Sequence, residues 1–276
     1  MESGSARSSI AAACGPGAKL TAQRSSGPMA SAAQMLVAGA GMLLIGALRG
    51  RWVAAIAAAV AVAGANVTTQ VLKMLVFRRD DLLGLGAWNG TNTLPSGHTT
   101  VAAAGLVGLM LVVPPWLRSI TTALGVVGVS AYGFATLVNH WHRPSDVAAA
   151  VLVAAGWGCL AVAAVRVAER RTPLRDVTHR PGATSVILVM LAICGLALSA
   201  AAGFMVWNAD PEATDRTTAF IAYVGGVAAL VGMTCGGLGG LLRLLDATRP
   251  MPRAKQRTEL GEIGRASCRE RVSSPV

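Results

Sequence analysis

The chain is built from seven apolar blocks, each about as long as a bilayer-spanning helix. They are Ala32–Leu48, Val53–Phe77, His98–Val113, Ile120–Asn139, Asp146–Val165, Thr184–Trp207 and Thr218–Leu242. Hydrophobic residues make up 53% of the chain and charged residues only 13%, against roughly 25% charged in a soluble protein. The sequence therefore predicts an all-α, polytopic transmembrane bundle of about seven helices, packed through small Ala and Gly residues.

The charges between the blocks predict an orientation. Arginines and lysines gather at alternate connections, whereas the connection Asn208–Thr217 is acidic, which is the positive-inside pattern. It places Arg166–Gly182 and the C-terminal tail in the cytoplasm, and Arg78–Gly97 and His140–Ser145 on the outer side. The net charge of +11 is thus explained by the membrane, and we expect no nucleic-acid partner. The simple loops and the high Ala and Gly content indicate a bacterial cell membrane.

The same pattern predicts the division of the chain. Residues 1–31 are expected to form a disordered segment without a signal peptide, 32–165 a transmembrane core, and 166–183 a cytoplasmic basic loop. Residues 184–242 would add two helices, and 243–262 a basic tail. Residues 263–276 begin with a string, IGRASCRERV, that a common sequencing adapter encodes in one frame, so we interpret them as an artefact or a disordered tail.

The cysteines carry no predicted function. Cys159, Cys194 and Cys235 lie inside apolar blocks, where cysteine behaves as a small hydrophobic residue. No spacing of Cys and His predicts a zinc site. We expect neither a metal nor another cofactor.

Three polar clusters lie at the outer ends of apolar blocks. In the first, Asn66, Gln70 and Lys73 share one helical face by their spacing, and Arg79 follows. Polar groups at membrane depth commonly mark a site. A lysine that extends from a helix end to the membrane surface is the simpler interpretation of Lys73.

The second cluster is Pro95-Ser96-Gly97-His98, which leads directly into an apolar helix. Backbone N–H groups at a helix N-terminus bind anions, and Ser96 adds a hydroxyl. His98 has an ordinary pKa that suits a general acid. A plain helix cap is the alternative interpretation.

In the third cluster, His142 and Asp146 are four residues apart. A carboxylate on one imidazole nitrogen leaves the other nitrogen available as a nucleophile. The alternative is a polar loop with a capping aspartate. All three clusters fall on one predicted membrane face, and together they favour the binding and cleavage of a phosphate. Their placement at the membrane edge indicates a lipid phosphate.

These motifs resemble those of the type 2 phosphatidic acid phosphatase family, whose core is shared with vanadium haloperoxidases. The resemblance spans about Asn66–Gly156 and is strongest at Pro95–His98 and at His142 with Asp146. It implies a six-helix type of core and a metal-independent hydrolase of lipid phosphates or pyrophosphates. It further implies a phosphohistidine on His142, oriented by Asp146, with His98 as the acid. Lys73, Arg79, Ser96 and Gly97 would bind the phosphate.

The chain departs from the family pattern at three points. Asp80 replaces a proline after Arg79, and Thr136 stands where the third motif has an arginine. Arg143 or Arg78 would have to supply that guanidinium. Only two apolar blocks precede Pro95, where the family has three helices, which suggests that a first helix is missing.

Two other functions fit the sequence. A small transporter or flippase-like bundle would need polar residues through the whole bilayer depth, whereas here they stop in the outer half. A catalytically inactive scaffold is favoured by Thr136 and Asp80. Phosphate release from a lipid phosphate would separate these possibilities.

Overall fold

A computed structural model describes residues 28–77, 93–139, 142–169, 182–209 and 215–248. Its elements are α2 (Pro28–Leu48), α3 (Trp52–Val71) with the π-helical turn η1 (Leu72–Val76), α4 (Gly97–Val112), α5 (Pro115–Val138), α6 (Pro144–Ala168), α7 (Ala183–Trp207) and α8 (Arg216–Ala247). All seven apolar blocks are helical, and these ranges contain no strand. The predicted fold class, a helical membrane bundle, is confirmed.

Five of the helical segments are long and apolar enough to cross a membrane: Trp52–Val76, Pro115–Val138, Pro144–Ala168, Ala183–Trp207 and Arg216–Ala247. The helix α4 and the segment Gly39–Leu48 are apolar but shorter. Large apolar side chains such as Leu124, Ile187 and Phe220 are exposed on the outside of the bundle. An apolar exterior of this kind suits lipid, so the chain is a multi-pass membrane protein.

Local sequence signals explain where the helices begin. Pro115 and Pro144 are the first residues of α5 and α6, where a proline loses no helical hydrogen bond. The Asp215 carboxylate accepts a hydrogen bond of 2.8 Å from the backbone N–H of Thr218 at the start of α8. This hydrogen bond is the largest cause of the lowered pKa of Asp215, because it favours the charged form.

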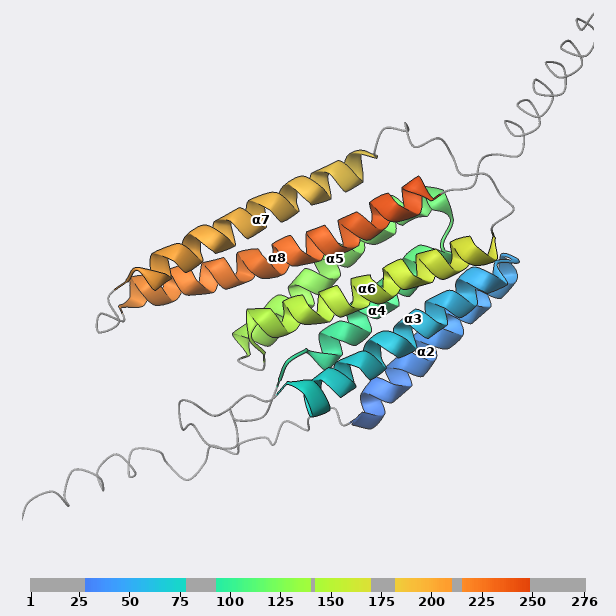
Figure 1. Ribbon diagram of the computed structural model, residues 1–276, viewed down its shortest axis with the longest axis horizontal. Helices are drawn as coiled ribbons and strands as arrows, with labels where there is room; N and C mark the ends of the chain where they lie inside the picture. The colour runs from blue at the N-terminus through green and yellow to red at the C-terminus, as the bar shows by residue number, and fades with distance from the viewer. Residues whose placement is uncertain (1–27, 78–92, 140–141, 170–181, 210–214, 249–276) are drawn as a thin grey trace, which may run out of the picture.

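The core is formed mainly by α3, α4 and α6, which lie side by side, with α2 flanking α3 and α8 covering α5 and α6 (Figure 1). Most of its buried side chains are alanine and valine, for example Ala58, Ala65, Val107 and Ala154. Small side chains let the helix axes approach closely, which maximises van der Waals contact where no water can drive association. The helices that carry the polar clusters are therefore packed closely against one another.

The outermost helix, α7, packs along α8 through glycines (Figure 1). A Cβ atom on Gly195 would lie 2.8 Å from the carbonyl oxygen of Ala228 and 2.9 Å from the Cα of Gly232. Because these are backbone atoms, they cannot move aside without separating the two helices. Gly195 therefore sets the distance between α7 and α8.

We expect Gly195→Val to lower the free energy of unfolding by about 2 kcal/mol, the usual scale for an overpacked core position. Gly203→Val is the matched control, because nothing lies within 4 Å of a Cβ at Gly203 on the same helix. Thermal unfolding in detergent should show a lower midpoint for the first variant alone. Equal midpoints for both variants would contradict this account of the α7–α8 interface.

Candidate active site

The three predicted clusters meet at one end of the bundle. This end contains the last turn of α3 with η1 and the first turns of α4 and α6 (Figure 1). Lys73, His98 and His142 line the same groove, and both Lys73 and His142 are close enough to His98 to interact with it electrostatically. Residues far apart in the sequence are thus brought together as the three motifs predict.

The polar face of α3 faces this groove. Asn66, Gln70 and Lys73 all line it, as their spacing predicts. The buried Asn66 side chain donates a hydrogen bond of 2.8 Å to the carbonyl oxygen of Val62. Lys73 lies in the π-helical turn, Leu72–Val76, a widened turn that occurs often at functional sites. Lys73 is half-buried and interacts electrostatically with His98. It is the only cation among the described residues of α3 and η1.

Ser96 caps α4 from a fully buried position. Its hydroxyl accepts hydrogen bonds from the Thr99 backbone N–H at 3.4 Å and from the Thr99 hydroxyl at 3.0 Å. The Thr100 hydroxyl donates to the Ser96 carbonyl oxygen at 2.9 Å and lies 3.0 Å from the Thr69 hydroxyl of α3. The capping interpretation is thus confirmed for Ser96, whereas phosphate binding by its hydroxyl stays a prediction. The buried hydroxyls fix the first turn of α4, and Gly97 and His98 line the groove from it.

The third cluster begins α6. The side chain of His142 is 9% exposed and that of Asp146 is 0% exposed, and 3.5 Å separates the His142 Nδ1 atom from the Asp146 Oδ2 atom. The two atoms do not form a hydrogen bond, and His142 Nδ1 has no hydrogen-bond partner among the described residues. Contacts of this kind commonly shorten when substrate binds. The carboxylate is placed to hold Nδ1–H and leave Nε2 available for chemistry.

A contact that the sequence analysis missed holds the Asp146 carboxylate in place. The Thr93 hydroxyl donates to Asp146 Oδ2 at 2.6 Å, and the Arg143 backbone N–H donates to the same atom at 3.0 Å. The backbone N–H of Ser96 also donates to the Asp146 carbonyl oxygen at 3.0 Å. These bonds join the second and third clusters directly. The only sequence signal was the position of Thr93, a short hydroxyl side chain two residues before Pro95.

The groove extends well beyond the polar residues. It has a volume of about 930 Å³ and lies between α2, α3 and α4. Its polar lining is concentrated at the site end, and the remainder is apolar, with residues such as Leu36, Leu43, Ala59 and Val67. Leu36 and Val67 are strongly exposed, so the groove is open along its side. A long apolar chain with a charged head fits this shape.

The other predicted phosphate ligands are placed less favourably or not described. The Arg143 side chain is exposed and does not line the groove. Arg78, Arg79 and Asp80 lie outside the described residues. Thr136, at the position of the expected arginine, is 3% exposed, and its carbonyl oxygen accepts a hydrogen bond from the His142 backbone N–H at 3.4 Å. Thr136 therefore holds the backbone of His142, just before α6, through its carbonyl group.

The chemistry of the described groove is that of an anion site. Its polar side chains are one lysine, two histidines and two amides. No carboxylate is among the described residues that line it, and the carboxylate of Asp146 lies next to His142. Within the described ranges, no three His, Cys, Asp or Glu side chains gather in a way that could hold a metal ion.

The part of the chain that carries this site matches a protein-family model. Residues 54–170 match the family model described as the PAP2 superfamily. No curated protein and no solved structure matches the chain. Members of this superfamily are phosphatases, so the match indicates a phosphoric ester hydrolase with a phosphorylated substrate. The matched segment runs from α3 through α6 and contains every described residue of the three clusters, so this part of the chain is similar to the PAP2 superfamily.

Proposed function

We propose that the protein hydrolyses a lipid phosphate or pyrophosphate through a phosphohistidine on His142. The observation that carries the proposal is the pairing of His142 with the fully buried Asp146 beside His98, at the charged end of an otherwise apolar groove. An oriented imidazole supplies the nucleophile, and a second imidazole supplies the proton.

In the first step, Nε2 of His142 attacks phosphorus and the bond from phosphorus to the leaving oxygen breaks. His98 gives its proton to that oxygen, so the oxygen leaves as a hydroxyl group of the alcohol or of the shortened phosphate. The positive charge of Lys73 and the N-terminal backbone N–H groups of α4 stabilise the charge that develops on the phosphoryl oxygens. Arg79 and the Ser96 hydroxyl are the further phosphate ligands that the family resemblance implies.

In the second step, water attacks the phosphorus of the phosphohistidine. His98, now neutral, accepts a proton from this water, and the bond between phosphorus and Nε2 breaks. Orthophosphate leaves, and His142 and His98 return to their starting protonation states. Asp146 holds the same imidazole nitrogen throughout, so it stabilises the cationic ring without itself reacting.

The apolar part of the groove supports a lipid as the substrate. A soluble phosphate ester would contact only the polar end, whereas a lipid chain would also bury apolar surface along α2 and α3, at about 0.8 kcal/mol for each CH₂ group. The charge distribution between the helices supports an outer location of this end of the bundle. We therefore propose a lipid substrate drawn from the outer leaflet of the cell membrane.

The purified full chain, in detergent, tests this proposal. Phosphate release should be measured with phosphatidic acid, with an isoprenoid pyrophosphate and with water-soluble glycerol phosphate. We expect kcat/KM for at least one lipid to exceed that for the soluble ester by more than about 100-fold, because the buried chain contributes binding energy. Equal values would remove the lipid assignment. No release from any of the three would instead favour an inactive scaffold.

His98→Ala should have an effect that depends on the leaving group. With phosphatidic acid we expect a loss of roughly 10²- to 10⁴-fold in kcat, the usual contribution of a general acid. With p-nitrophenyl phosphate the loss should be much smaller, because nitrophenolate departs without a proton. Asn139→Ala, an exposed change near the same end, is the control. An equal loss with both substrates would argue against His98 as the acid.

A further inference from the structure

A second polar pocket lies at the opposite end of the bundle from the histidines. Arg51 precedes α3, Leu111 is near the end of α4, and Arg166 and Glu169 are at the end of α6. The same three helices carry Lys73, His98 and Asp146 at their other ends. Arg51 and Lys73 are separated by a helix that rises roughly 30 Å, so the two pockets face opposite membrane surfaces.

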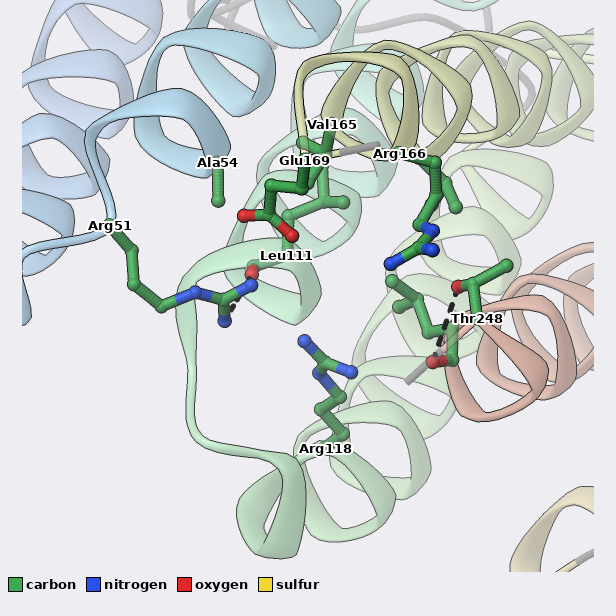
Figure 2. A pocket seen from close by; sticks show the side chains of 10 residues that line it. Arg51, Ala54, Leu111, Arg118, Val165, Arg166, Glu169 and Thr248 are labelled. Carbon is green, nitrogen blue, oxygen red and sulfur yellow. Dashed lines mark hydrogen bonds between the residues drawn. The ribbon is translucent and has the colours of Figure 1, made fainter. Parts of the chain in front are cut away.

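Three arginines from three different elements converge on this pocket. Figure 2 shows the guanidinium groups of Arg51, Arg118 and Arg166 pointing toward a shared space, with the Glu169 carboxylate at its edge. The pocket encloses about 40 Å³, about three times the volume that one water molecule requires. The described residues that line it include three arginines and one glutamate, so this lining is predominantly positive and suits an anion.

Two of the arginines are fixed by the end of α4. The Nε atom of Arg118 donates to the Met110 carbonyl oxygen at 3.1 Å, and an Nη atom of Arg51 donates to the Leu111 carbonyl oxygen at 3.5 Å. The Arg118 side chain is only 5% exposed. These bonds satisfy the last carbonyl groups of α4, and they also hold the guanidinium planes in position before any ligand arrives. A preorganised arginine loses little entropy on binding.

The arrangement fits a tetrahedral oxyanion better than a planar one. The arginines approach from three directions, and a phosphate group offers an oxygen to each, whereas a carboxylate offers both oxygens in one plane. Guanidinium groups bind phosphate through paired hydrogen bonds. Basic pockets between transmembrane helices are also suited to the headgroups of anionic lipids.

We propose that the pocket lined by Arg51, Arg118 and Arg166 binds a phosphate group at the membrane face opposite the candidate active site. The group belongs either to an anionic phospholipid of that leaflet or to free inorganic phosphate, since both present anionic oxygens on a tetrahedral phosphorus. This binding is independent of the proposed catalysis.

Two measurements on the full chain in neutral detergent distinguish the sources. Native mass spectrometry would count the phosphatidylglycerol molecules retained, with phosphatidylcholine for comparison. Phosphatidylglycerol is a phosphodiester, so it is not the monoester that the candidate active site would cleave. Thermal unfolding with inorganic phosphate, against chloride at equal ionic strength, would report the free ion. The latter experiment is run in Lys73→Gln and wild-type protein, so that phosphate binding at the charged end of the groove is seen separately.

Arg166→Gln should weaken retention of phosphatidylglycerol, or stabilisation by phosphate, at least 10-fold, and Arg118→Gln should do the same. Arg243→Gln, an exposed change on α8, should behave as wild type. Circular dichroism reports whether each variant is folded. Because Arg118 also bonds to Met110, the Arg166 variant and the wild-type protein decide the matter if the Arg118 variant does not fold.

Selective lipid retention that Arg166→Gln abolishes supports a lipid headgroup. A phosphate effect that Arg166→Gln abolishes, without selective lipid retention, supports the free ion. The proposal is overturned if wild-type protein shows no preference for either ligand, or if Arg166→Gln and Arg243→Gln bind equally well. In that case the arginines serve only to cap α4.

Discussion

His142→Ala is expected to reduce phosphate release from a lipid phosphate by roughly 10³-fold or more, because the variant lacks the atom that bonds to phosphorus. The loss should appear in kcat rather than in KM, since Lys73 and the first turn of α4 still bind the phosphate. Steady-state assays in detergent measure it. The fold should be retained, because no described side-chain hydrogen bond depends on the imidazole.

Rapid quenching with phosphorus-labelled substrate gives an independent readout. Wild-type protein should carry an acid-labile, base-stable label, as expected of a phosphoramidate, and His142→Ala should carry none. His179→Ala is the matched control, since this histidine lies in the basic connection between α6 and α7. Wild-type turnover in the His142 variant, or a label on another residue, would contradict the proposed nucleophile.

Asp146→Asn is expected to lower kcat by about 10²- to 10⁴-fold while leaving the fold intact. The amide keeps the shape of the side chain and can still accept the hydrogen bond from Thr93. With that oxygen in place, the neutral amide no longer supplies the negative charge that stabilises the imidazolium, because His142 Nδ1 faces the same Oδ2 atom as the Thr93 hydroxyl. Because phosphate binding does not involve Asp146, KM should change little.

Asp146→Ala separates positioning from folding. It removes the acceptor of the hydrogen bonds from the Thr93 hydroxyl and the Arg143 backbone N–H at a fully buried position. We expect a loss of about 2 kcal/mol or more in unfolding free energy, in addition to the loss of activity. If Asp146→Asn had wild-type kcat, or if it unfolded as readily as Asp146→Ala, Asp146 would be a structural cap and no positioning residue.

The helices were largely predictable, because a bilayer requires long apolar runs and this chain has few other apolar runs. The errors lie at charged residues. We predicted that one helix begins at Ile120, whereas α5 begins at Pro115 and includes Arg118. A charge normally marks the end of a membrane segment, but Arg118 is buried by its bond to the Met110 carbonyl oxygen on another helix. Such a long-range partner cannot be seen in a single sequence.

The candidate site was predictable to the same degree. Helical spacing placed Asn66, Gln70 and Lys73 on one face, because that depends on local sequence. His98 was placed with His142 by their common membrane face and by the family resemblance. The bond from Thr93 to Asp146 and the arginine pocket depend on tertiary packing, so no local pattern indicated them. The positions of Arg79 and of the loop around it lie outside the described residues, and phosphate binding there stays a prediction.

The open side of the groove determines how a substrate would be supplied. Exposed Leu36 and Val67 border it, so a lipid could enter sideways without leaving its leaflet. The enzyme would then respond to the mole fraction of substrate in the membrane plane rather than to its concentration in the surrounding water. Diluting the substrate with neutral lipid would slow turnover, whereas diluting the whole suspension with buffer would not.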